Sequence, residues 1–224
     1  MKTCYIVAAG DADKINIERD DGDIIIACDA GLEHCRLNNV VPDMLIGDFD
    51  SLGYIPECEN KIVLPVAKDD TDTSYAVKYA MEKGFSRFVI FGGAGGKRPE
   101  HTYANIALLA YISKHGCEGF LACGGYTVTA LTDAKISFRA GLAGDVSVFS
   151  FDNVSTGVYE KGLLYSLEDA VLENSVVMGI SNSFTGQESS ISVRNGTLII
   201  YFSANFSDIS IDKQTNDDII SIEK

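Results

Sequence analysis

The chain has 224 residues, of which 46% are hydrophobic and 22% are charged, and its formal net charge at pH 7 is −14. This composition is typical of a globular protein with one large domain or two modest ones. So acidic a chain repels phosphodiester backbones and anionic lipids, which argues against a nucleic-acid-binding or membrane-surface protein. An anionic substrate would need a metal ion or a local basic site.

The cysteine pattern and the apolar runs indicate the compartment. Six cysteines, at positions 4, 28, 35, 58, 117 and 123, form no CxxC pair, and several lie in apolar runs. They are typical of reduced, buried thiols rather than of a disulfide framework. The first residues contain no apolar segment long enough for export, and no run approaches the ~20 residues needed to cross a bilayer. We therefore expect a cytoplasmic protein.

Short apolar runs alternate with helical patterns in the first half of the chain. Helical spacing of apolar residues predicts helices at 32–37, after KDDTD up to Gly84, and at 101–114 before Gly116. The alternation predicts a mostly parallel sheet with helices on both faces. The expected strands are CYIVAAG (4–10), DIIIACDAG (23–31), MLIGDFDS (44–51), KIVLPV (61–66), RFVIFGG (87–93) and GFLACGG (119–125).

From about Tyr126 the chain changes to short segments rich in β-branched and aromatic residues. They predict antiparallel strands in a small sandwich or barrel, with one more strand and then frayed residues in the polar tail after Ser207. The predicted fold is thus an α/β N-terminal domain with a mostly parallel sheet, residues 1–133, followed by an all-β C-terminal sandwich domain, residues 134–224. The expected strands are TVTALTD (127–133), KISFRA (135–140), DVSVFSF (145–151), VVMGI (176–180), SSISVRNG (189–196) and TLIIYF (197–202).

Polar side chains follow four successive strands of the predicted parallel sheet. Ligands of such sheets collect at the carboxyl ends of the strands, so we expect these side chains to share one crevice. Clustered carboxylates need a counter-charge, and Mg²⁺ takes carboxylate oxygens while sharing its other positions with water and phosphate. The pattern therefore predicts a metal-nucleotide site. Its members are Asp29; Asp48 and Asp50, which would point the same way in an extended chain; Asp69, Asp70 and Asp72; and GGAGGKRPEH with Lys97, Arg98, Glu100 and His101.

Each of these motifs is weak when taken alone. DFD or DDTD is more often a solvated loop or a helix cap, here at Thr71 or Asp72. GGAGG lacks the spacing of a P-loop, and His34 and His115 have no partner at metal-ligand spacing. The coincidence of four polar clusters at four strand ends is what favours a functional site.

Six motifs resemble, in order and spacing, the thiamin pyrophosphokinase family over nearly the whole chain. They are CDAGL, PDMLIGDFDSL, KDDTD, GGAGGKRPEHTYANIALL, KGLLYSLEDAVL and GISNSF. The resemblance implies that a pyrophosphoryl group passes from ATP to the hydroxyethyl oxygen of thiamin, with Mg²⁺, giving thiamin diphosphate and AMP. It also implies an α/β nucleotide domain followed by a β-sandwich, in a homodimer that holds thiamin between its subunits.

The resemblance assigns roles to individual residues. Asp50, Asp72 and Arg98 would be catalytic. One of the clustered aspartates would accept the hydroxyl proton, and Asp72 is our candidate for this role. Arg98 suits a forked contact with phosphate. Without the resemblance, GISNSF would be a strand-end turn. The full assignment is Asp48, Asp50, Asp69 and Asp72 for Mg²⁺ and phosphates; Asp29, Ser51, Lys68, Arg98, His101 and Asn105 for the nucleotide; and Ser181 and Asn182 for the thiamin pyrimidine.

Two features depart from the family pattern. Glu100 stands before His101 where the family has aspartate, so the position of that carboxylate shifts. The chain has no Trp, so an aromatic platform for thiamin must come from Tyr or Phe.

Two alternatives remain. A DxD-type nucleotide-sugar transferase would use Asp48 and Asp50 but leaves KDDTD and KRPEH without a role. A non-catalytic thiamin- or nucleotide-binding protein would keep the scaffold, with Glu100 marking decay of the site. Formation of AMP separates both from the kinase.

Overall fold

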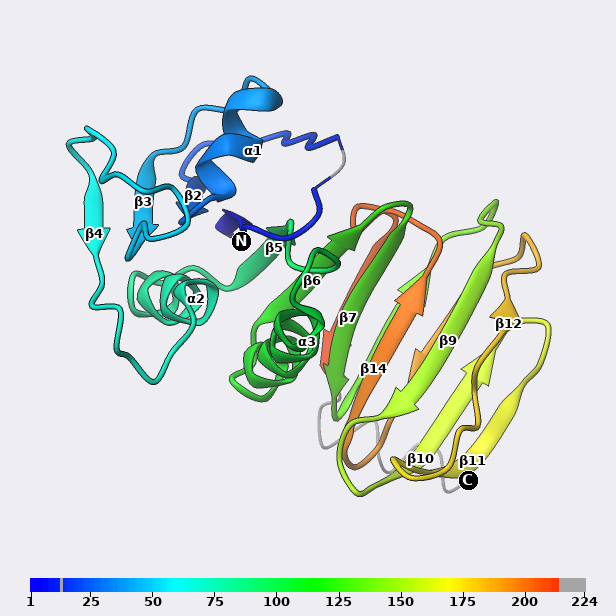
Figure 1. Cartoon of the computed structure of the whole chain (residues 1–224). Helices are drawn as coiled ribbons and strands as arrows, with labels where there is room; N and C mark the ends of the chain where they lie inside the picture. Colours follow the sequence, from blue (N-terminus) through cyan, green and yellow to red (C-terminus); the bar gives the residue numbers. More distant parts are fainter. Residues whose placement is uncertain (13, 214–224) are drawn as a thin grey trace. The chain divides into compact units, whose positions relative to one another are not determined.

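The computed structural model describes residues 1–12 and 14–213, and these form two compact units (Figure 1). Unit 1 comprises Met1–Leu108 and Gly116–Gly124, and unit 2 comprises Leu109–His115 and the chain from Gly125 onward. This division lies earlier in the chain than the predicted domain boundary at Asp133, and it assigns the end of the third helix to unit 2.

Unit 1 is built on a parallel sheet. The strand order is β6-β5-β1-β2-β3-β4, and every pairing between these neighbours is parallel. β1 lies inside the sheet and all five of its residues are buried, as expected for a strand covered on both faces. The mostly parallel sheet is therefore confirmed. Its strands are β1 Thr3–Val7, β2 Ile24–Cys28, β3 Met44–Gly47, β4 Lys61–Val63, β5 Arg87–Phe91 and β6 Glu118–Cys123.

Three helices connect these strands: α1 Gly31–Leu37, α2 Asp72–Glu82 and α3 Pro99–Lys114. α1 and α2 lie on opposite sides of β2 and β3 (Figure 1). The chain moves outward across the sheet through α1 and returns through α2, so the rule of right-handed crossovers requires opposite faces for the two helices. The predicted helices are confirmed. In α3 the buried residues include Asn105, Leu108, Leu109, Ala110 and Ile112. No helix in the described part of the chain combines the length and apolar character that a membrane span requires.

Unit 2 is a sandwich of two antiparallel sheets. One has the order β7-β14-β9-β12 and the other β11-β10-β13-β8-β15. Side chains from both sheets form one core, in which Phe138 contacts Phe184 and Phe202 edge to face. The predicted sandwich is confirmed. Its strands are β7 Tyr126–Thr132, β8 Ala134–Phe138, β9 Asp145–Ser150, β10 Val154–Lys161, β11 Leu167–Glu173, β12 Asn182–Ser183, β13 Ser189–Ser192, β14 Thr197–Phe202 and β15 Ile209–Lys213.

One predicted strand of the sandwich is wrong. VVMGI, residues 176–180, is not a strand, and its Val177 side chain is 73% exposed. The strands that precede it, β10 and β11, were not predicted; in β11 three acidic residues interrupt the apolar pattern of LEDAVLE, and the strand lies at the sheet edge. The predicted strand after Ser207 is confirmed as β15, and the predicted frayed tail lies outside the described residues.

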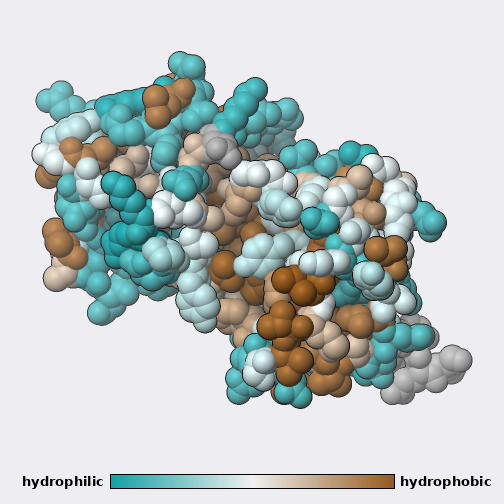
Figure 2. All heavy atoms as spheres, turned by 45° about the vertical axis from the view of Figure 1, so that its right-hand side comes forward, coloured by the Kyte–Doolittle hydropathy of each residue, from teal (hydrophilic) through white to brown (hydrophobic). Residues whose placement is uncertain are grey.

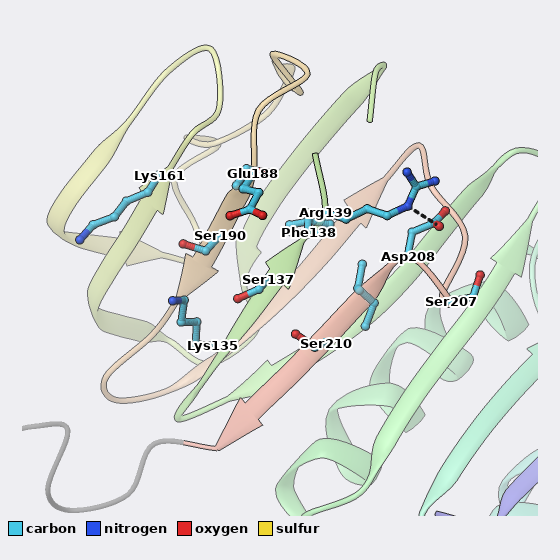
Figure 3. A pocket seen from close by; sticks show the side chains of 12 residues that line it. Lys135, Ser137, Phe138, Arg139, Lys161, Glu188, Ser190, Ser207, Asp208 and Ser210 are labelled. Atoms are coloured by element: carbon cyan, nitrogen blue, oxygen red, sulfur yellow. Dashed lines mark hydrogen bonds and ion pairs between the residues drawn. The ribbon is translucent and has the colours of Figure 1, made fainter. Parts of the chain in front are cut away.

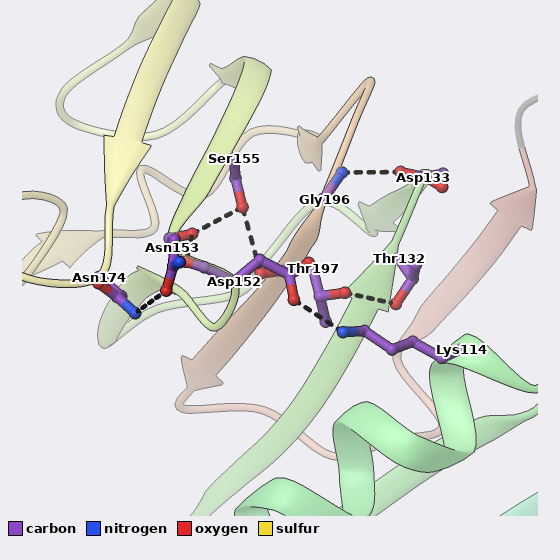
Figure 4. A network of polar contacts seen from close by, with 10 residues as sticks. Lys114, Thr132, Asp133, Asp152, Asn153, Ser155, Asn174, Gly196 and Thr197 are labelled. Atoms are coloured by element: carbon purple, nitrogen blue, oxygen red, sulfur yellow. Dashed lines mark hydrogen bonds and ion pairs between the residues drawn. The ribbon is translucent and has the colours of Figure 1, made fainter.

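A polar network ties the end of α3 to the sandwich strands (Figure 4). Lys114 Nζ donates to Asp152 Oδ1 at 2.7 Å, and the hydroxyl groups of Thr132 and Thr197 lie 3.1 Å apart across β7 and β14. These contacts anchor the last turn of α3 within unit 2.

Candidate active site

A cavity of about 750 Å³ lies in unit 1 at the carboxyl ends of its parallel strands. It is bordered by the segments that follow β1, β2, β3 and β5 and by the segment that leads into α2. The four polar clusters of the sequence thus reach one cavity. The predicted residues that line it are Asp29, Asp48, Asp50, Ser51, Lys68, Asp72, Arg98, His101 and Asn105.

Three carboxylates converge in this cavity. Asp29, Asp48 and Asp50 each place one oxygen within 4.8 Å of the others. Oδ1 of Asp29 is buried and has no hydrogen-bond partner among the described residues. A buried, unpartnered carboxylate oxygen beside two further carboxylates fits a hard divalent cation such as Mg²⁺. The sequence had assigned Asp29 to the nucleotide, whereas the structure groups it with the two metal candidates.

The chain between Asp48 and Asp50 forms a turn, so the extended conformation expected there is wrong. Phe49 has a positive φ of 58° and its side chain is only 2% exposed. The left-handed backbone turns the ring into the core while both neighbouring carboxylates reach the cavity. Ser51 supports the turn, since its hydroxyl donates to Asp50 Oδ1 at 3.2 Å.

A close backbone approach brings Asp29 to this position. Gly31 begins α1 against β1, where a Cβ atom would collide with the carbonyl oxygen of Val7. Glycine therefore lets α1 start directly after β2, and Asp29 is held in the short turn between them, with a φ of 48°.

Lys68 links two of the predicted metal ligands. Its Nζ lies 2.6 Å from Asp48 Oδ2 and 3.0 Å from Asp72 Oδ1, and all three side chains are mostly buried. The Lys68 hydrogen bond lowers the pKa of Asp48. Burial outweighs Lys68 at Asp72 and raises the pKa of that carboxyl. Lys68 thus supplies the positive charge closest to these acids.

The remaining acids of KDDTD have other positions. Asp69 is exposed and does not line the cavity. Asp70 lines it, but both of its carboxylate oxygens accept from Lys78, at 2.6 and 2.9 Å. Thr71 caps α2, because its Oγ1 accepts from the N–H of Ser74 at 3.1 Å.

The glycine loop after β5 is held by two side chains of one helix. Asn105, which is buried, donates to the carbonyl of Gly93 at 2.6 Å, and Thr102 accepts from the N–H of Gly95 at 3.0 Å. Both side chains come from α3. They fix the loop relative to the helix that also carries His101.

Arg98 reaches the cavity wall but is already paired. Its Nε donates to Glu100 Oε1 at 2.8 Å, and its side chain is 70% exposed. The Arg98 hydrogen bond lowers the pKa of Glu100. Glu100, the residue that departs from the family pattern, therefore lies beside the predicted phosphate-binding guanidinium.

Asp11 is a cavity residue that the sequence did not single out. Its Oδ2 accepts from the N–H of Gly96 at 2.7 Å, and its main chain bridges to Ala94. Gly10 passes so close to the loop that a Cβ atom would lie 2.6 Å from the carbonyl oxygen of Gly92. The signal that could have found it is an acidic residue after β1, the same pattern that marked Asp29.

In unit 2, Asn182 has a fully occupied side chain. Its Nδ2 donates to Glu160 Oε2 at 2.6 Å and to the carbonyl of Tyr165 at 2.7 Å. Its Oδ1 accepts from the N–H groups of Tyr165 and Ser183, each at 2.9 Å. Ser181 beside it is exposed, with a φ of 61°. Direct contact of Asn182 with thiamin stays a prediction.

Exposed hydrophobic side chains lie near these residues in the sequence. Leu164 and Tyr165 are 59% and 65% exposed, and the segment 176–180 carries four more. Figure 2, in which the right-hand side of Figure 1 is turned forward, shows hydrophobic side chains on the surface of the molecule.

A second hollow, of about 580 Å³, lies on the outer face of β8, β13 and β15 (Figure 3). Ser190, Ser137 and Ser210 are direct neighbours across the three strands, and Arg139 pairs with Asp208 at 2.8 Å. It contains none of the predicted site residues.

Cys4, Cys28 and Cys35 are buried free thiols, as predicted, whereas Cys58, Cys117 and Cys123 are only partly buried. Cys28 lines the cavity, and its Sγ donates to the carbonyl of Asp72 at 3.7 Å. Burial raises its pKa well above the usual range. It is thus a structural thiol that holds β2 against the start of α2.

Comparisons with known proteins agree with this architecture. The catalytic domain of thiamin pyrophosphokinase matches residues 16–121, and the vitamin B1 binding domain of the same enzyme matches residues 132–198. No curated protein matches the chain in sequence.

Solved structures share the fold at low sequence identity. Thiamine pyrophosphokinase from Bacillus subtilis has a TM-score of 0.78 at 24% identity, over 91% of this chain and 100% of its own. Thiamin pyrophosphokinase from Candida albicans has a TM-score of 0.69 at 15% identity, over 91% of this chain and 89% of its own. The yeast enzyme has a TM-score of 0.67 at 13% identity, over 92% of this chain and 87% of its own. Because both family models describe parts of one enzyme and together match most of the chain, the chain belongs to the thiamin pyrophosphokinase family and is a thiamine diphosphokinase.

Proposed function

We propose that the acidic cavity of unit 1 binds Mg²⁺ and ATP and catalyses pyrophosphoryl transfer to thiamin. The observation that supports this most directly is the convergence of Asp29, Asp48 and Asp50, with the buried Asp29 Oδ1 lacking a partner among the described residues. These three carboxylates, with Asp72, would hold the metal. When bound, the ion would supply positive charge that neutralises the negative charge developing on the phosphates during transfer.

The protein's own residues would position the reactants. Lys68 and Arg98 line the cavity and supply positive charge for the phosphates, and the glycine loop presents its backbone beside them. The thiamin hydroxyl would attack the β-phosphorus in line, with AMP as the leaving group, so catalysis depends mainly on alignment and charge. Asp72 is our candidate for accepting the hydroxyl proton.

Thiamin would contact unit 2 near Ser181. Tyr165 has a largely exposed ring, and its main chain is held by the Asn182 side chain. In a chain without Trp, this ring is our candidate for the aromatic surface against thiamin. We further propose a cytoplasmic homodimer that binds thiamin between its subunits.

The test is product identification. Purified protein with ATP, Mg²⁺ and thiamin should give equal amounts of thiamin diphosphate and AMP, and EDTA should abolish both until Mg²⁺ is restored. Release of ADP, or binding of both substrates without turnover, would overturn the proposal.

A further inference from the structure

Glu160 is a carboxyl group inside the sandwich of unit 2. It lies near the end of β10, its side chain is 1% exposed, and Val158 of the same strand is fully buried. Its Oε1 is buried without a hydrogen-bond partner among the described residues, while Oε2 accepts from Asn182. Burial of an acid with so few partners costs free energy, and an apolar residue there would commonly stabilise the fold at least as well. Stability alone therefore does not explain Glu160.

The contact with Asn182 determines how that carboxamide is oriented. Nδ2 must face Glu160 and the carbonyl of Tyr165, and Oδ1 must face the two N–H groups that it accepts from. A flipped amide would turn its oxygen toward the Glu160 carboxyl oxygen and its N–H groups toward other N–H groups. Glu160 thus acts together with the main-chain groups of Tyr165 and Ser183 to select one of the two orientations of the Asn182 side chain.

The oriented carboxamide then holds the main chain of Tyr165. It bonds to both the N–H and the carbonyl of this residue, in the way that a neighbouring strand would. Leu164 adds a bond from its N–H to the carbonyl of Ser183 at 2.9 Å. The main chain that carries the exposed Tyr165 ring is therefore held beside β12.

We propose that Glu160 is a positioning residue for thiamin: it helps to orient Asn182, which in turn holds the main chain of Tyr165 in the arrangement that binds the substrate. The inference rests on the proposed function, because it requires that thiamin contacts this part of unit 2. It adds a residue that touches no substrate and acts only through Asn182.

Two substitutions at position 160 test the proposal. Glu160→Leu keeps a similar volume but removes the acceptor, so KM for thiamin should rise about tenfold, the scale of one lost buried hydrogen bond, while KM for ATP stays within about twofold. Glu160→Gln keeps an acceptor for Asn182 and should stay close to the wild type in both constants. A rise of both KM values together, or an unchanged KM for thiamin in Glu160→Leu, would overturn the proposal.

Controls separate positioning from general loosening of the sandwich. Leu172→Ala removes a buried side chain of β11 that makes no hydrogen bond to Asn182, so it should lower the melting temperature without a thiamin-specific change in KM.

Asn182→Ala should reproduce the defect of Glu160→Leu, and the effects of the two changes on KM for thiamin should not add in the double variant. Asn182→Ala also decides the matter if Glu160→Leu fails to fold, since a normal KM for thiamin in Asn182→Ala contradicts the proposal. If the wild type makes no thiamin diphosphate, the proposed function fails; if it does and these variants bind thiamin normally, only this inference fails.

Discussion

The side-chain nitrogen of Lys68 lies 2.6 Å from Oδ2 of Asp48. The Lys68 side chain is 15% exposed and that of Asp48 is 10% exposed, so water screens this pair less than an exposed one. Lys68 also reaches Asp72, so two acids that we assign to the metal share one ammonium group. A divalent ion that binds these acids must replace Lys68 as their positive counter-charge.

The variant Lys68→Met tests this exchange. Without metal, the protein should lose about 1–3 kcal/mol of unfolding free energy, the cost of removing a charged hydrogen-bond partner from a mostly buried acid. Mg²⁺ alone should bind more tightly, because no ammonium group competes for the carboxylates, whereas ATP should bind more weakly. Urea unfolding and titration calorimetry measure these three effects.

Lys78→Met is the matched control for Lys68→Met. Lys78 bonds to Asp70, which is outside the proposed metal ligands, so its loss removes the same charge from the same region of unit 1. Mg²⁺ binding should change far less than in Lys68→Met. Equal tightening in both variants would show that net charge alone controls the affinity.

The acidic cluster predicts which carboxylates turnover requires. Asp50→Asn and Asp72→Asn should each lower turnover more than about 100-fold, the scale of losing a key charge-stabilising group, with an unchanged circular dichroism spectrum. Steady-state assays of AMP release measure the effect. Near-normal turnover in either variant would refute the metal assignment.

The structure and the family resemblance lead to different expectations for the role of Asp69. The resemblance assigns it to the metal, but it is exposed and does not line the cavity. We therefore expect Asp69→Asn to retain most of the wild-type turnover in the same assay. A loss as large as that of Asp50→Asn would return Asp69 to the metal site.

Asp11 should affect ATP binding through the glycine loop. Asp11→Ala removes the acceptor of the Gly96 N–H, so KM for ATP should rise by about fivefold to tenfold, the effect of one hydrogen bond. KM for thiamin should not change. Asp11→Asn, which can still accept the bond, is the control and should lie near the wild type; an equal defect in both variants would point to the charge instead.

The buried acid of unit 2 predicts a pH dependence of stability. Burial raises the pKa of Glu160 above its ordinary value of 4.5, so the folded chain binds a proton that the unfolded chain releases. Stability from this group therefore falls as pH rises from 4.5 to the raised pKa. The melting temperature of Glu160→Gln relative to the wild type should rise over that range, and a constant difference would contradict the raised pKa.

The sequence could predict the site because of the sheet type. Parallel strands bring their carboxyl ends to one edge, so Asp29 and Asp48 could be expected together from the sequence alone. Asp11 also lies after the end of a parallel strand. It was missed because small apolar residues precede it, so no polar cluster marks the end of that strand. The left-handed Phe49 could not be foreseen, because nothing in GDFDS distinguishes an extended chain from a turn that buries one ring.

The sandwich was harder to predict in detail. An apolar run such as VVMGI satisfies strand propensity, yet only tertiary pairing decides whether it joins a sheet, and here it stays exposed. The role of Asn182 was equally hidden, since its four contacts depend on β12 lying beside residues 163–165, far away in the sequence.

Phe49 lies with its ring in the core of unit 1 and with an acid on each side of it. The packing of the core and the spacing of the two carboxylates therefore depend on the same short stretch of backbone. A change of volume in the hydrophobic layer under this ring would move the oxygens relative to each other without altering any residue that meets a ligand. Mutations that impair the enzyme should consequently be found deep in the unit as well as around the cavity.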